Sequence, residues 1–88
     1  MEIIILDAVK MTSRDRAYDY INRIMRFPDY AGKNLDALHD CLSEFGKDRI
    51  IIFMNTAALE ENLGKYAEKM LTVFRSTAEE AGYTFIEK

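Results

Sequence analysis

Residues 49–54, with the sequence RIIIFM, decide the fold of this chain. An unbroken apolar run rich in β-branched residues is typical of a strand buried on both faces, because a half-solvated strand alternates apolar and polar positions. Residues 3–6 (IIIL) repeat the pattern near the N-terminus, and residues 83–86 (YTFI) form a weaker third run near the C-terminus. The sequence therefore predicts three strands, the first two buried on both faces.

Helical periodicity separates the first two strands. Thr12 or Ser13 can cap a first helix, which Pro28 ends because proline restricts the residue before it. Asn34 is a good N-cap for a second helix, and Gly46 is a plausible stop. Two helices are therefore expected between these strands.

Two further helical segments follow the second strand. Residues 57–63 form a short one that ends at a glycine, and residues 65–80 form the longest one. Helices that connect buried strands imply crossover connections and a parallel sheet. We therefore predict an α/β fold, a small three-stranded parallel sheet packed with three to four helices, with the strand order left open.

The composition predicts one domain spanning residues 1–88. Apolar residues make up 49% of the chain, which is enough for a core without a metal or cofactor. The single cysteine, Cys41, cannot form an internal disulfide, as expected for a reducing compartment. No apolar run approaches the length of a membrane span or a signal-peptide core. A cytoplasmic protein with no membrane contact is expected.

The negative charge is concentrated in one stretch. Between Pro28 and Gly46 lie Asp29 and three further acidic residues against one lysine, a balance of −3 that equals the net charge of the whole chain. Such a field repels phosphate backbones and attracts basic proteins. Direct binding to nucleic acid is therefore not expected. A monomer is expected, because this surface repels its own copy.

The polar face of the second helix carries the candidate site. Asp36, His39, Asp40 and Ser43 follow one another at helical spacing on that face. Two aspartates four residues apart on a helix repel each other, so their presence on one face can indicate a functional role. From charge alone, however, an ordinary solvated face is the favoured interpretation.

The loop before this helix carries a large aromatic residue, Tyr30, and a glycine, Gly32, that could adopt a positive φ. Tyr30 either offers contact area to a partner, as tyrosines at binding hot spots do, or packs under the loop. The residues leave both interpretations open.

The sequence gives little indication that the protein is an enzyme. Asp36, His39 and Asp40 are possible metal ligands, but all come from one helix face with no matched fourth ligand. Cys41 lies on the apolar side of its helix and is expected to be an inert core thiol. No phosphate loop or nucleophile elbow is present. No metal or cofactor site is expected, and a metal-dependent enzyme ranks below a binding protein.

Residues 28–42, with the sequence PDYAGKNLDALHDCL, closely resemble the loop and helix of the barstar family, intracellular inhibitors of barnase-type ribonucleases. The order of the flanking segments is also similar, including Val73-Phe74-Arg75 in the last helix. The resemblance implies a non-catalytic inhibitor, of the immunity or antitoxin type, that plugs the cationic active site of a guanyl-preferring ribonuclease. The alternative is a regulatory module whose acidic helix docks on another basic protein or toxin.

The resemblance also implies roles for single residues. Asp40 would be the chief mimic of an RNA phosphate, Asp36 would face the base side, and Tyr30 would pack over the catalytic centre. Backbone or polar contacts would come from Gly32, Asn34 and Ser43. With His39, the implied partner-binding set is therefore Tyr30, Gly32, Asn34, Asp36, His39, Asp40 and Ser43.

The chain departs from the family pattern at four positions. His39 replaces an aromatic residue, Ala31 a second tyrosine, Phe45 a tryptophan and Ser76 an acidic residue. The contact face thereby loses a carboxylate and a large aromatic side chain. These departures favour a related ribonuclease or another basic toxin over barnase itself.

Overall fold

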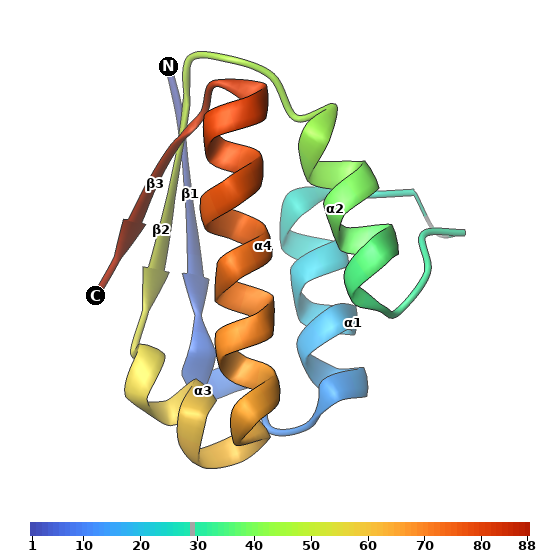
Figure 1. Cartoon of the computed structure of the whole chain (residues 1–88), viewed down its shortest axis with the longest axis vertical. Helices are drawn as coiled ribbons and strands as arrows, with labels where there is room; N and C mark the ends of the chain where they lie inside the picture. The colour runs from blue at the N-terminus through green and yellow to red at the C-terminus, as the bar shows by residue number, and fades with distance from the viewer. Residues whose placement is uncertain (29) are drawn as a thin grey trace.

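A computed structural model describes residues 1–28 and 30–88 (Figure 1). The strands β1 (Glu2–Asp7), β2 (Arg49–Met54) and β3 (Thr84–Glu87) form one parallel sheet in the order β1-β2-β3. The predicted parallel sheet is confirmed, and β2 is its central strand. Asp29, which belongs to the acidic stretch, lies outside the described residues.

In the described residues four α-helices accompany the sheet, within the three to four that the sequence predicts. They are α1 (Arg14–Met25), α2 (Leu35–Ser43), α3 (Thr56–Leu63) and α4 (Lys65–Ala81). A short 3-10 helix, η1 (Ala8–Lys10), follows β1 and was not expected from the sequence. In Figure 1 the sheet, α4 and α2 lie side by side in that order, so α2 is remote from the sheet.

Local signals set the start of α1 and the end of α4 where the sequence predicts them, whereas α2 ends at Ser43, before the predicted stop at Gly46. The hydroxyl of Ser13 accepts a hydrogen bond from the backbone N–H of Arg16 and caps α1. Arg26 ends that helix in the left-handed conformation, two residues before Pro28. Gly82 ends α4 with φ of 89°, a conformation that glycine adopts without strain.

The expectation that the strands are buried on both faces is wrong. Ile4 and Leu6 of β1 point into the core, whereas the alternating residues Ile3 and Ile5 are more than half exposed. The helices cover only one face of the sheet, and a continuous apolar run cannot reveal whether one or two layers cover it.

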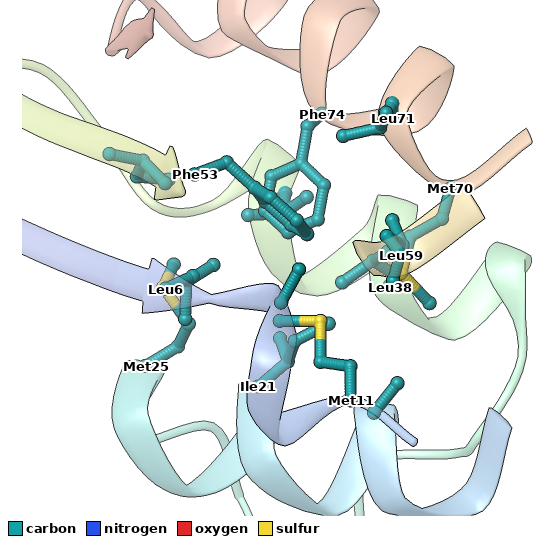
Figure 2. Packing of buried hydrophobic residues seen from close by; sticks show 14 of the residues in the cluster. Leu6, Met11, Ile21, Met25, Leu38, Phe53, Leu59, Met70, Leu71 and Phe74 are labelled. Atoms are coloured by element: carbon teal, nitrogen blue, oxygen red, sulfur yellow. The ribbon is translucent and has the colours of Figure 1, made fainter. Parts of the chain in front are cut away.

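The core lies between that face and the helices. Figure 2 shows Phe53 of β2 facing Phe74 of α4, and their ring centroids are 5.4 Å apart at a steep angle. Leu6, Ile21 and Leu38 bring β1, α1 and α2 into the same cluster. This core holds α2 against α4 and thereby fixes the orientation of its polar face.

Candidate functional site: the acidic face of α2

The start of α2 is built by two residues of the predicted site. The side-chain oxygen of Asn34 accepts a hydrogen bond of 2.8 Å from the backbone N–H of Ala37, so the predicted N-cap is confirmed. Gly32 does not have the positive φ that a glycine could adopt there. A Cβ at position 32 would instead lie 3.1 Å from the Cβ of Ala37, and this close approach to the first helical turn explains the glycine.

The two aspartates of α2 are exposed on one face of the helix. Asp36 lies in the first turn, where the positive end of the helix dipole favours a carboxylate. The side chain of Asp40 is 86% exposed. Among the described residues, neither carboxylate lies within salt-bridge distance of a lysine or arginine. Both negative charges are therefore available to a basic partner.

The lysine of the acidic stretch is engaged elsewhere. The ammonium of Lys33 lies 2.8 Å from a carboxylate oxygen of Asp19 on α1, and this hydrogen bond raises the pKa of Lys33. The pair ties the loop before α2 to α1. It also leaves the charge of the α2 aspartates without a neighbouring cation from the loop.

The other predicted site residues differ in what they can offer a partner. Tyr30 is 89% exposed, so the interpretation in which it packs under the loop is wrong. His39 is half-buried and its Nε2 lies 3.3 Å from a carboxylate oxygen of Glu80 on α4. Ser43 donates its hydroxyl to the backbone carbonyl of Asp40, so its oxygen remains as an acceptor.

A cavity of about 480 Å³ lies between the loop and the C-terminal half of α2. Asp40 and Glu44 line it together with Tyr30, and two arginines, Arg26 and Arg49, line it as well. Glu44 was not among the predicted site residues, although its position four residues after Asp40 signals that it continues the same helix face. The structure therefore extends the acidic face by one carboxylate.

Cys41 also lines this cavity and is only partly buried, so its description as a core thiol needs correction. Partial burial raises the pKa of the thiol, and the neighbouring carboxylates of Glu44 and Asp40 raise it further. The thiolate, which is the reactive form, is thereby disfavoured.

The acidic face does not assemble a metal centre in the part of the chain that the structure describes. No group of three histidine, cysteine, aspartate or glutamate side chains there is close enough to hold an ion. Nor is any described helix both long enough and apolar enough to cross a bilayer. The acidic face presents exposed carboxylates beside the exposed ring of Tyr30, and such a surface suits contact with a basic protein.

Comparison with known proteins shows the family of this chain. The family model described as "Barstar (barnase inhibitor)" matches residues 1–87. The chain belongs to the barstar family. It is also similar to "Putative ribonuclease inhibitor YrdF" of Bacillus subtilis (strain 168), with 33% identity over 81 residues, which cover 91% of this chain and 89% of that protein.

Barstar family members are inhibitors and not enzymes, as the resemblance implied. Both comparisons support a ribonuclease-inhibitor role. The family match covers β1 through β3, so it includes the loop and α2 together with the sheet and helices that hold them.

Proposed function

We propose that the protein inhibits a barnase-like, guanyl-preferring ribonuclease by inserting the acidic face of α2 into its active site. The observation that carries the proposal is the exposed carboxylate of Asp40 in the middle of that face, without a lysine or arginine partner among the described residues. A ribonuclease site is lined with cationic groups that bind phosphate. A carboxylate presented by a rigid helix can take the place of that phosphate.

Each residue of the face has a role in this proposal. Asp40 is the chief phosphate mimic, and Asp36 faces the base side of the nuclease site. Tyr30 packs over the catalytic centre, which its exposure allows. Gly32, Asn34 and Ser43 provide close backbone and polar contacts at the rim.

In this proposal, the residues that depart from the family pattern determine which nuclease the protein binds. Ala31 offers little contact area, and His39 is held to α4 by Glu80. Ser76 donates its hydroxyl to backbone carbonyls of its own helix and supplies no charge. These differences favour a related ribonuclease over barnase itself. They also support a second candidate, a regulatory module that docks on a different basic protein or toxin.

The test is a titration of RNA cleavage with the wild-type protein, Asp40→Ala and Glu61→Ala. The last variant removes an exposed carboxylate from α3 and is the matched control. We expect stoichiometric inhibition by the wild-type and control proteins. Asp40→Ala should weaken binding by about 2–5 kcal/mol, as the loss of an interfacial charge partner does.

Equal inhibition by all three proteins would contradict phosphate mimicry by Asp40. Absence of inhibition for every barnase-type ribonuclease tested would favour the regulatory module. An immunity or antitoxin role in the cytoplasm further predicts that co-expression lets cells survive production of the nuclease, and that Asp40→Ala removes this protection.

A further inference from the structure

The acidic face of α2 carries one group of its own that can become a cation, the imidazole of His39. Its Nδ1 lies 3.8 Å from a carboxylate oxygen of Asp40, and its Nε2 lies 3.3 Å from a carboxylate oxygen of Glu80. In the part of the chain that the structure describes, no lysine or arginine lies within ion-pair distance of either carboxylate. Within that part, a protonated His39 is therefore the cation that can pair with them.

The groups that surround His39 come from two helices that pack against each other (Figure 1). On α2, Asp36 precedes it by nearly one turn on the same face, and Asp40 follows it directly. On α4, Glu80 is the charged group beside it, and Ser76, one turn earlier, donates its hydroxyl to backbone carbonyls of its own helix. The charged groups beside the imidazole are thus negative on both helices.

The imidazole is accessible to solvent in the free protein. The side chain of His39 is 43% exposed, that of Asp40 86% and that of Glu80 55%. The ring therefore exchanges protons with the solution. A partner that covers Asp40 also covers the Nδ1 side of the ring, because the two groups are adjacent.

The two carboxylates determine which ring nitrogen takes up the second proton. A neutral imidazole carries one proton, and a carboxylate oxygen favours that proton on the nearer nitrogen. The shorter of the two distances joins Glu80 to Nε2, so the second proton goes to Nδ1, on the side of Asp40. Protonation thus places positive charge beside the carboxylate that the proposed function assigns to the nuclease.

We propose that His39 makes inhibition depend on pH, because its protonated ring competes with the cations of the nuclease for Asp40. This inference rests on the proposed function. In the complex, the carboxylate of Asp40 pairs with cationic groups of the active site, and a protonated His39 would lie among like charges. The complex therefore disfavours the protonated ring, and binding of the nuclease releases a proton from it.

Inhibition should weaken in acid as a result. Imidazole side chains take up a proton near pH 6.5, so binding is strongest above that pH and becomes weaker as the pH falls through it. At about pH 5.5 roughly nine-tenths of such rings are protonated. A complex that accepts only the neutral ring then loses about tenfold in affinity, and one that partly tolerates the charge loses about fivefold.

Calorimetric titration at about pH 8 and about pH 5.5 tests the proposal with the wild-type protein and His39→Gln. The probe is barnase or, if barnase is not inhibited, the barnase-type ribonuclease that is inhibited most strongly at the higher pH. Because both proteins meet the same nuclease, titration of the nuclease's own groups affects them alike. Between the two pH values, the dissociation constant of the wild-type complex should rise about five- to tenfold more than that of the His39→Gln complex.

The number of protons released is a second measurement. Titration at about pH 6 in two buffers of different ionisation enthalpy should show about half a proton more released by the wild-type protein than by His39→Gln. Glu80→Gln removes the carboxylate beside Nε2 and should move the loss of affinity to lower pH. Glu79→Gln changes an exposed carboxylate of α4 that is not within ion-pair distance of His39, and it should behave as the wild type does.

Circular dichroism at both pH values establishes that the proteins are folded. If His39→Gln is not, His39→Phe replaces it, because phenylalanine cannot take up a proton either. Inhibition with the same pH dependence in the wild-type protein and the His39 variant would overturn the inference and leave the proposed function intact. Failure to inhibit any barnase-type ribonuclease would overturn the proposed function and this inference with it.

Discussion

The imidazole of His39 joins α2 to α4, because its Nε2 lies 3.3 Å from a carboxylate oxygen of Glu80. Its Nδ1 lies 3.8 Å from a carboxylate oxygen of Asp40. The contact places a carboxylate of the last helix beside the acidic face. Glu80 therefore adds a negative charge close to the acidic face.

Neutralising Glu80 should slow binding to the target ribonuclease. Attraction between the acidic face and a cationic active site accelerates encounter, and this effect depends on charges close to the contact. We expect Glu80→Gln to lower the association rate about twofold at low salt, with a smaller effect at high salt. Stopped-flow fluorescence measures both rates. Glu61→Gln makes the same charge change on α3 and should lower the association rate less. If both variants lower it equally, the effect comes from the net charge of the protein and not from the position of Glu80.

Asn34 should affect stability and binding separately. Loss of its capping hydrogen bond to Ala37 in Asn34→Ala should lower the free energy of unfolding by about 1 kcal/mol. Asn34→Ser keeps a capping oxygen and should retain stability, while it removes the side-chain amide and with it part of the polar contact proposed for this residue. Urea denaturation and calorimetric titration distinguish the two effects. If Asn34→Ser is as unstable as Asn34→Ala, the capping role is wrong.

Because of the ion pair between Arg75 and Glu87, the free energy of unfolding should fall at acidic pH. Both carboxylate oxygens of Glu87 accept hydrogen bonds from the Arg75 guanidinium, at 2.7 and 2.8 Å, and these bonds lower the pKa of Glu87. A carboxyl with a lowered folded-state pKa contributes stability above its unfolded-state pKa of about 4.3 and loses it as the pH falls through the folded value.

Glu87→Gln should therefore lower the free energy of unfolding by about 1 kcal/mol at neutral pH, the upper end for exposed pairs. The difference from the wild type should shrink as the pH falls below about 4. Urea denaturation across this range is the measurement. Glu79→Gln on α4 is the control, and a deficit for Glu87→Gln that persists unchanged at low pH would refute the ion-pair explanation.

The buried phenol of Tyr83 should make the protein sensitive to alkali. Burial raises its pKa to about 12, and its hydroxyl donates to the carbonyl of Phe74. Because the folded-state pKa is raised, the stabilisation is complete below the unfolded value of about 10 and is lost as the pH rises through 12. Tyr83→Phe should lose about 1 kcal/mol at neutral pH and show a shallower alkaline decline. Unfolding at alkaline pH can be followed by fluorescence. If Tyr83→Phe loses stability with pH as steeply as the wild type does, other groups cause the alkaline loss of stability.

Local features of the fold were predictable from the sequence. Ser13, Asn34 and Gly82 act through contacts or backbone conformations within a few residues, so short patterns identify them. The three strands follow from apolar runs in the same way. The exposure of Ile3 was not predictable, because a continuous apolar strand has the same sequence under one covering layer as under two.

The candidate site, like the fold, was predictable from the sequence only in part. The spacing of Asp36 and Asp40 on one helix predicts a shared exposed face, which the structure confirms for both side chains. Glu80 was missed because it reaches this face only through the packing of α4 against α2. Gly32 was misinterpreted because its close neighbour, Ala37, comes near it only when α2 has formed.

Competition with a guanosine monophosphate tests the central claim most directly. The dissociation constant of the protein for its ribonuclease would be measured by calorimetry at increasing nucleotide concentration. If the carboxylate of Asp40 takes the place of an RNA phosphate, the apparent dissociation constant should rise linearly with nucleotide concentration and keep rising after the nucleotide has filled the active site. An unchanged dissociation constant at saturating nucleotide, with all three molecules in one complex, would contradict it.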